Sequence, residues 1–113
     1  MTGFQRGQIW LVNFDPSFGH EYKKAHPALI IQNDKYIESS SLLAVVPISS
    51  QIDKQTELDI LIKSNSQNRL MKDLLLKMKQ VSSFDKGRFI KLIGTADEAT
   101  MKRVKKNIKV YLV

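Results

Sequence analysis

Several residue types that constrain function are scarce or missing in this 113-residue chain. It has no cysteine, which excludes disulfide bonds and thiolate metal sites, and it has only one tryptophan. Its apolar runs are six residues or shorter, far below the ~20 residues that a membrane-spanning helix needs. The first residues also lack the basic-then-apolar pattern of a signal peptide. We therefore expect one globular domain over residues 1–113, cytoplasmic and with no membrane partner.

Acidic residues are also few relative to basic ones. Lys and Arg number 18 against 11 Asp and Glu, which gives a net charge of +7. Such a surplus on a small domain favours an anionic partner, such as a nucleic acid, an acidic protein segment or a membrane surface. A basic surface that only keeps the protein soluble is the alternative. The charge narrows the class of partner and names no function.

Three apolar segments predict β-strands. Residues 8–14 (QIWLVNF) are apolar on both alternating faces, which favours a central strand. Residues 28–32 predict a second strand, and because Pro27 disfavours helix at the residue before it, His26 is expected to be extended. Residues 42–48 (LLAVVPI) predict a third strand, in which Pro47 indicates either a sheet edge or the end of the strand.

The middle of the chain contains one clear pattern and one ambiguous pattern. Residues 56–63 alternate, with Leu58, Ile60 and Ile62 on one face and charged residues on the other, so we expect a half-buried strand. Residues 70–81 (LMKDLLLKMKQV) have apolar residues at helical spacing, but they also alternate as a strand would. The pattern alone leaves both structures open.

The C-terminal segment predicts an amphipathic helix. Thr95 and Glu98 have the spacing of a capping box at its start. Basic residues cover most of the helix surface, and such a face is more often solvated than a binding site. The apolar stripe consists of Met101, Val104, Ile108, and Tyr111 or Leu112. Closely spaced strands followed by one helix predict a mainly β fold, either a small curved antiparallel sheet or a partly open barrel.

Several segments together resemble the MazF/PemK family of toxins. The N-terminal ones are RGQIWLV (6–12), FDP (14–16), GHE (19–21) and PALIIQND (27–34). The similarity continues with VPISS (46–50) and ends with QVSSFDKGRF (80–89), which is similar to the family's Gln-hydrophobic-Arg-Thr-hydrophobic-Asp-Lys-x-Arg block. Each piece alone is weak, but together they follow the family order over nearly the whole chain.

The resemblance implies both a fold and an activity. The fold is an SH3-like curved antiparallel β-barrel with a C-terminal α-helix, usually in a homodimer. The activity is that of a toxin from a toxin–antitoxin system, an endoribonuclease that cuts single-stranded RNA or mRNA without a metal or cofactor. An acidic antitoxin protein wraps and restrains such a toxin. Under this reading residues 70–81 are a strand, and Lys77 and Lys79 share one of its faces.

Metal-independent RNA cleavage generally uses the 2′-hydroxyl as nucleophile and leaves a cyclic phosphate. One group removes the hydroxyl proton and another protonates the departing 5′-oxygen, each contributing ~10²–10⁴-fold. Histidine suits both roles because its unperturbed pKa is about 6.5. The two histidines of the chain, His20 and His26, are therefore the candidates for proton transfer. His20 with Glu21 also matches the Gly-His-Glu pattern of the PemK branch, in which that histidine can act on RNA.

The resemblance adds two catalytic candidates, Ser49 and Lys77, and these positions and His26 depart from the family's usual residues. His26 stands where the family typically has an arginine, and an imidazole lacks the forked donors of arginine, so phosphate stabilisation and activity would be reduced. Ser49 replaces a threonine and keeps its hydroxyl, while Lys77 stands where the PemK branch carries a catalytic arginine. Further expected RNA contacts are Glu21, Lys23, Lys24, Ser50, Lys79 and Gln80.

Other functions stay open on the same fold. One is an RNA-binding protein with weak catalysis, and another is a protein that poisons an enzyme such as a topoisomerase, as the related CcdB branch does. That branch acts through a C-terminal tail containing tryptophan, whereas this chain ends in VYLV and has its only tryptophan at Trp10. A third is a non-toxic adaptor whose basic surface binds an acidic protein.

Overall fold

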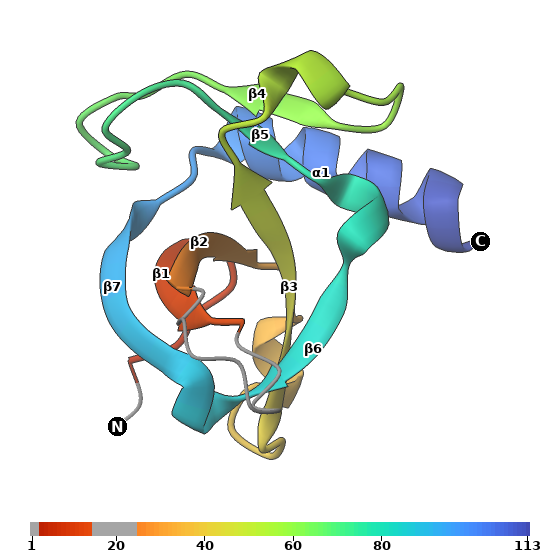
Figure 1. Cartoon of the computed structure of the whole chain (residues 1–113). Coiled ribbons are helices and arrows are strands. Elements are labelled where there is room, and N and C mark those ends of the chain that lie inside the picture. The colour runs from red at the N-terminus through yellow and green to blue at the C-terminus, as the bar shows by residue number, and fades with distance from the viewer. Residues whose placement is uncertain (1–2, 15–24) are drawn as a thin grey trace, which may run out of the picture.

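The computed structural model describes residues 3–14 and 25–113, which form a curved antiparallel sheet and one α-helix (Figure 1). The strands are β1 (Gln8–Asn13), β2 (Ala25–Ile30), β3 (Leu42–Ser49), β4 (Ile60–Ile62), β5 (Leu74–Leu76), β6 (Ser82–Asp85) and β7 (Phe89–Thr95), and the helix is α1 (Glu98–Leu112). The described residues also form the 3-10 turns η1 (Asp34–Tyr36), η2 (Ile52–Lys54), η3 (Met78–Gln80) and η4 (Lys86–Arg88). This is the mainly β fold with a C-terminal helix that we predicted.

Strand β3 lies at the centre of the sheet and pairs with β2, β5 and β6. Within the described residues the strand order is β4-β5-β3-β2-β1-β7, and β6 also pairs with β3. The first half of β3 pairs with β6, whereas Ile48 and Ser49 pair with β5. Pro47 lies between these two stretches and two residues before the end of β3. It therefore marks the end of a central strand and not a sheet edge, because β3 has neighbours on both sides.

Two apolar clusters hold the sheet together. Strand β2 contributes to both, since Leu29 packs into one cluster while Ala28 and Ile30 pack into the other. Strand β1 is divided in the same way between Ile9 and Val12, which confirms the prediction of a central strand. Burial on both faces explains why these strands are apolar at nearly every position.

The predicted strand over residues 56–63 is wrong in its first half. Strand β4 begins at Ile60, and the preceding residues form a turn in which the Asp59 N–H donates to the Thr56 carbonyl at 3.2 Å. Ile60 and Ile62 are buried and Leu61 is exposed, as the alternation predicts. Asp59, which was expected on the polar face, is only 5% exposed. Its carboxylate has distant hydrogen-bond donors that alternation cannot reveal.

Residues 70–81 are neither a helix nor one long strand. Strand β5 covers only Leu74–Leu76, and the 3-10 turn η3 follows it. The expectation that Lys77 and Lys79 share a strand face is therefore wrong. The two side chains diverge, Lys77 toward Asp59 and Lys79 toward Glu57.

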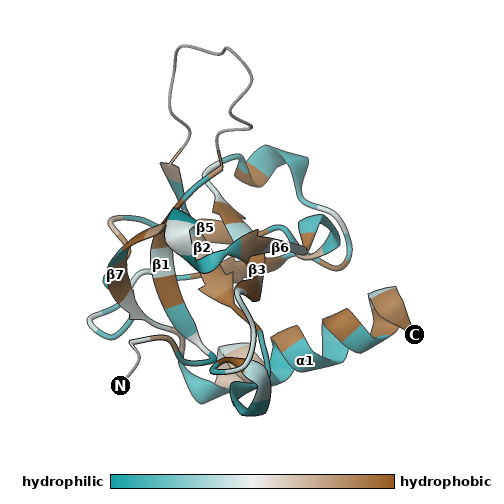
Figure 2. Ribbon diagram, turned by 90° about the horizontal axis from the view of Figure 1, so that it is seen from below, coloured by the Kyte–Doolittle hydropathy of each residue, from teal (hydrophilic) through white to brown (hydrophobic). Residues whose placement is uncertain are grey.

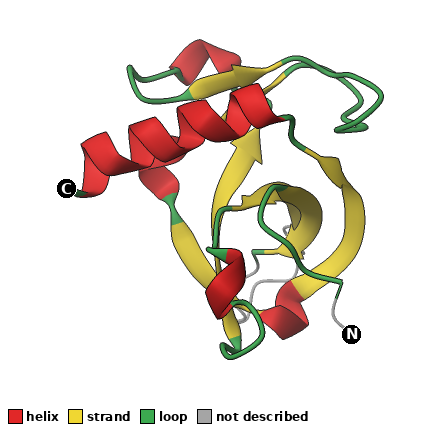
Figure 3. Cartoon of the chain, turned by 180° about the vertical axis from the view of Figure 1, so that it is seen from behind, coloured by secondary structure: helices red, strands yellow, loops and turns green. Residues whose placement is uncertain are grey.

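Helix α1 begins two residues later than the capping-box spacing predicts, because Thr95 belongs to β7. The N-cap is Asp97, whose carboxylate accepts a hydrogen bond from the Thr100 N–H at 2.8 Å. Figure 3 shows α1 lying across the molecule beside the short strands β4 and β5. Val104 is fully buried in the core, but Leu112 is 60% exposed, so the last turn of the predicted stripe is not part of the core. In the described part of the chain no helix is long and apolar enough to cross a bilayer.

Gly94 of β7 allows the loop before β5 to pack closely against the sheet. Asn68 of this loop is 2% exposed, and its side chain makes three hydrogen bonds to backbone groups of the same loop. The neighbouring Gln67 carbonyl accepts a hydrogen bond from the Thr95 N–H at 3.1 Å. A Cβ atom at Gly94 would lie 2.3 Å from the Asn68 carbonyl oxygen, so a larger residue requires the backbone to move.

We expect Gly94→Ala to lower the free energy of unfolding by about 3 kcal/mol, because the crowded atom belongs to backbone that is fixed by hydrogen bonds. Urea denaturation followed by circular dichroism measures this loss. Gly3→Ala is the matched control, since its Cβ would meet no atom closer than 3.9 Å and should change stability by less than about 0.5 kcal/mol. Equal losses in both variants would contradict the role assigned to Gly94.

Candidate active site

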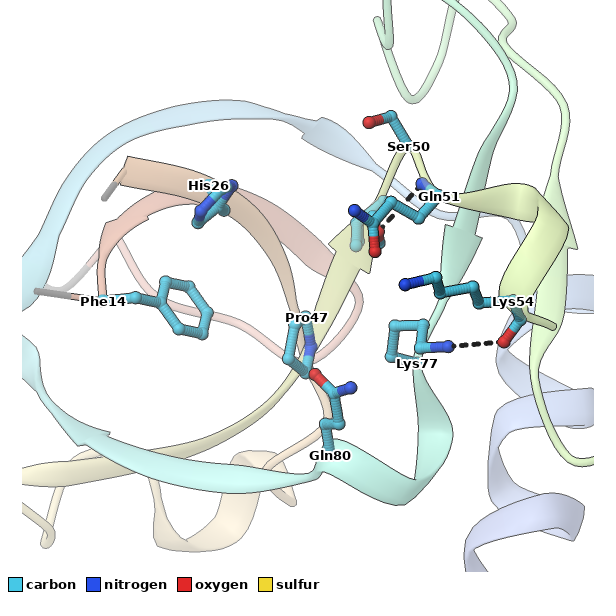
Figure 4. A pocket seen from close by; sticks show the side chains of 10 residues that line it. Phe14, His26, Pro47, Ser50, Gln51, Lys54, Lys77 and Gln80 are labelled. Carbon is cyan, nitrogen blue, oxygen red and sulfur yellow. Dashed lines mark hydrogen bonds between the residues drawn. The ribbon is translucent and has the colours of Figure 1, made fainter. Parts of the chain in front are cut away.

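A hollow of about 530 Å³ lies where β2 begins and β3 ends (Figure 4). Four chain segments meet there, which are the end of β1, the start of β2, the end of β3 with the turn after it, and the turn after β5. The lining residues are Phe14, His26, Pro47, Ile48, Ser49, Ser50, Gln51, Lys54, Lys77 and Gln80. None of them is acidic and two carry ammonium groups, so the hollow is suited to an anion.

Antiparallel pairing explains why His26 and Ser49 reach the same hollow. Ala28 of β2 pairs with Pro47 of β3, so the residues before Ala28 run beside those after Pro47. His26 lies two residues before the first of these and Ser49 two residues after the second. The His26 ring meets the Phe14 ring edge to face, with the ring centroids 5.7 Å apart. The imidazole is thus held at the end of the sheet and is exposed to solvent.

Lys77 and Gln80 enter the hollow from the β5 side. The Lys77 N–H donates to the Pro47 carbonyl at 2.9 Å, which fixes the Lys77 backbone beside β3. The Gln80 N–H in turn donates to the Lys77 carbonyl at 2.9 Å within η3. Figure 4 shows the Gln80 amide next to Pro47, while His26 and Phe14 lie across the hollow from the lysines.

The Lys77 ammonium is paired with a buried carboxylate. It lies 3.2 Å from Oδ2 of Asp59, and the two side chains are 13% and 1% exposed. The same carboxylate accepts hydrogen bonds from the backbone N–H groups of Thr56 and Met78, both at 2.9 Å. Burial raises the pKa of Asp59, but the hydrogen bonds from Thr56, Lys77 and Met78 outweigh it and hold the pKa below its ordinary value.

Ser49 closes the turn that follows β3. Its Oγ accepts a hydrogen bond from the Gln51 N–H at 3.0 Å. A hydroxyl that accepts in this way still has its own proton to donate. Ser49 can therefore hold the turn and at the same time donate to a phosphate oxygen in the hollow.

The structure brings together five of the predicted site residues: His26, Ser49, Ser50, Lys77 and Gln80. Lys79 does not line the hollow. Its ammonium lies 3.3 Å from a Glu57 carboxylate oxygen, in an ion pair whose side chains are 38% and 74% exposed. The other predicted residues, His20, Glu21, Lys23 and Lys24, lie outside the described residues. In the ranges 3–14 and 25–113 no three His, Asp or Glu side chains cluster in a way that could hold a metal ion.

Five lining residues are not among the predicted site residues: Phe14, Pro47, Ile48, Gln51 and Lys54. Pro47 and Ile48 are expected only as residues of the third strand. Phe14 is expected only as an apolar strand residue, although its ring also faces the hollow beside His26 (Figure 4). Gln51 and Lys54 lie in the turn after β3, where no hydrophobic period exists. Nothing in the sequence distinguishes Lys54 from the other exposed lysines of the chain.

This fold and this hollow agree with one protein family. The family described as PemK-like, MazF-like toxins of type II toxin–antitoxin systems matches residues 5–112. Because the match spans nearly the whole chain, the protein belongs to this family.

Similar proteins of known name agree with this assignment. Endoribonuclease MazF9 of Mycobacterium tuberculosis is 26% identical over 113 residues, covering 96% of this chain and 95% of its own length. Endoribonuclease MazF of Staphylococcus saprophyticus is 29% identical over 111 residues, covering 96% of this chain and 90% of its own. The structure of MazF from Deinococcus radiodurans has a TM-score of 0.76 at 20% identity, covering 95% of this chain and 94% of its own, which supports the fold.

The Asp59 ion pair makes stability depend on pH. Since the pKa of Asp59 is lowered by folding, its contribution is fully present above the ordinary value of 3.8 and is lost as the pH falls through the lowered pKa. We expect Asp59→Asn to lower the free energy of unfolding by about 3 kcal/mol near pH 7, and the deficit to shrink as the solution is acidified below 3.8. Urea denaturation at a series of pH values measures both effects.

The control for this prediction is Asp53→Asn. Asp53 is exposed in η2, close to Asp59 in the sequence, and its removal should change stability by less than about 0.5 kcal/mol at every pH. If Asp59→Asn lowers the free energy of unfolding no more than Asp53→Asn does, the Asp59 carboxylate does not stabilise the region around the hollow.

Proposed function

We propose that the protein is a toxin that cleaves single-stranded RNA as an endoribonuclease and is restrained by an acidic antitoxin. The observation that carries this proposal is the hollow itself, where an imidazole, two serine hydroxyls and two ammonium groups from separate segments meet without an acidic residue in the lining. Membership of the toxin family and the names of the relatives, Endoribonuclease MazF9 and Endoribonuclease MazF, support the same activity.

The proposed reaction is an attack by the neighbouring 2′-hydroxyl of the RNA. A base takes the hydroxyl proton, the 2′-oxygen forms a bond to phosphorus, the bond from phosphorus to the 5′-oxygen breaks, and an acid protonates that oxygen. The products are a 2′,3′-cyclic phosphate and a 5′-hydroxyl. His26 is exposed at the hollow and carries one of the two proton transfers in this proposal, and His20 is the candidate for the other.

The remaining groups would bind the phosphate and the bases. Ser49 donates its hydroxyl proton to a non-bridging oxygen, and an ammonium group of the hollow stabilises the negative charge of the phosphorane. Phe14 offers a ring on which a base can stack, and the Gln80 amide can bind a base edge. With His26 in place of the family's arginine, the phosphate loses a forked donor, so these other groups carry more of the binding.

The partners follow from charge and exposed apolar surface. The net charge of +7 favours an acidic antitoxin, and one similar structure is a mycobacterial endoribonuclease in complex with its cognate antitoxin (TM-score 0.73, 18% identity, covering 95% of this chain and 92% of that one). Val110, Leu112 and Val113 are exposed at the end of α1, and Figure 2 shows hydrophobic residues at that end of the helix. This exposed apolar surface supports association with a second copy as a homodimer.

Enzyme poisoning through a tryptophan tail has no support in the structure. The only tryptophan, Trp10, lies in β1, and its ring packs against Phe4 and Phe89 with centroid distances of 4.8 and 6.2 Å. It is therefore part of the packing at the N-terminal side of the sheet and not an exposed anchor.

The purified protein should cut single-stranded RNA in the presence of EDTA and leave 2′,3′-cyclic phosphate ends. His26→Ala should lower the single-turnover rate by about 10²-fold or more, because one proton transfer is lost. The thermal unfolding midpoint should fall only slightly, since His26 is exposed and the variant loses one ring contact, with Phe14.

Three results would redirect this proposal. Wild-type rates in both His26→Ala and His20→Ala would remove the imidazoles from the mechanism. RNA binding by the wild-type protein with a log–log salt slope near −0.7 per phosphate contacted, but without cleavage, would indicate an RNA-binding protein. Neither binding nor cleavage would leave a protein target as the alternative.

The hydroxyl of Ser49 should matter for the rate even though the residue is small. We expect Ser49→Ala to lower the cleavage rate by about tenfold or more and Ser49→Thr to keep it, because threonine retains the donor. Ser83→Ala is the control, since Ser83 is an exposed serine of β6 outside the hollow. An equal loss in Ser49→Thr and Ser49→Ala would show that the turn geometry matters and the donated proton does not.

A further inference from the structure

The two lysines of the hollow differ in what surrounds their charges. The Lys77 ammonium lies 3.2 Å from the Asp59 carboxylate and donates to the Lys54 carbonyl oxygen at 3.1 Å. Only 13% of the Lys77 side chain is exposed, so its charge is matched inside the protein. A phosphate at Lys77 would have to compete with a carboxylate that is also held by two backbone N–H groups.

Lys54 has the opposite surroundings. Its side chain is exposed and lines the hollow, and Figure 4 shows its ammonium directed into the open space below Gln51. Its Cα position is nevertheless fixed, because the Lys54 N–H donates to the Gln51 carbonyl at 3.3 Å and its own carbonyl accepts from Lys77. In the described part of the chain no carboxylate pairs with the Lys54 ammonium.

These contacts favour Lys54 as the group that meets an anion. An ammonium without an internal partner keeps its full charge for an arriving phosphate, whereas a paired one contributes little additional field. Because the Lys54 backbone is already held, binding has to order only the side chain. The hydrogen bond from Lys77 sets the point from which that side chain extends.

We propose that Lys54 is the phosphate-binding cation of this site, and that Lys77 is a positioning residue that acts through the Lys54 carbonyl. The assignment rests on the proposed cleavage of RNA and specifies which side chain binds the substrate. It differs from the role implied by the family resemblance, in which Lys77 itself meets the phosphate.

Lys54→Gln tests the first half of this assignment. The variant should lower kcat/KM for single-stranded RNA by about tenfold or more. It should also make the log–log salt slope of RNA binding less steep by about 0.7, with an unchanged unfolding midpoint. Lys72→Gln is the matched control, because Lys72 is an exposed lysine outside the hollow and should leave all three measurements unchanged.

Two variants of Lys77 test the second half. Lys77→Met leaves Asp59 charged without its cation, so the unfolding midpoint should fall. Adding Asp59→Asn removes both charges, and this double variant should recover part of the midpoint and keep the wild-type salt slope. A slope reduced by about 0.7 in the double variant, together with a wild-type slope in Lys54→Gln, would overturn the proposal.

Measuring RNA binding and cleavage by the wild-type protein shows whether the proposed function fails or only the assignment of Lys54. If the wild type neither binds nor cuts single-stranded RNA, the proposed function fails and the assignment of Lys54 fails with it. If the wild type cuts RNA and Lys54→Gln does so at the same rate and with the same salt slope, only the assignment fails.

Discussion

One buried carboxylate organises the region that forms the hollow. Asp59 accepts hydrogen bonds from Thr56, which closes its own turn, and from Met78 and Lys77, which belong to the segment after β5. Removing water from a carboxylate is costly, so the arrangement is stable only because several donors satisfy its oxygens. The turn before β4 and the turn after β5 are thereby joined, and Lys77 reaches from this junction to the turn that contains Lys54.

The wall of the hollow is positively charged because the nearby carboxylate, Asp59, is buried behind the wall and is not part of it. Asp59 is 5% exposed and does not line the space, whereas the side chain of Lys54 is exposed to it. A surface of this kind attracts phosphates of any sequence, so cleavage specificity must come from contacts to the bases. The residues of the wall whose chemistry suits that task are Phe14, Gln51 and Gln80.

Much of this architecture could be predicted from the sequence, but only where neighbouring residues carry the information. The strands near residues 8–14 and 42–48 and the buried stripe of α1 follow from hydrophobic periodicity. The late start of β4 could not be predicted, because the turn before it depends on the buried Asp59. The Asp59 carboxylate accepts a hydrogen bond from the Met78 N–H, 19 positions later in the chain, and a local pattern cannot show this contact. Ser49 could be predicted because it lies within a family segment, and His26 because it is a histidine directly before one, whereas Lys54 lies in a turn with neither periodicity nor such a segment.

The place of β3 in the chain determines when the hollow can form during synthesis. Its partners β5 and β6, and the residues Lys77 and Gln80, all follow it in the chain, and contacts between distant segments are slow to form. A nascent chain that has been made only as far as the end of β3 contains His26 and Ser49 but lacks the opposite wall. The hollow is therefore incomplete on the ribosome until the segment that follows β5 has emerged.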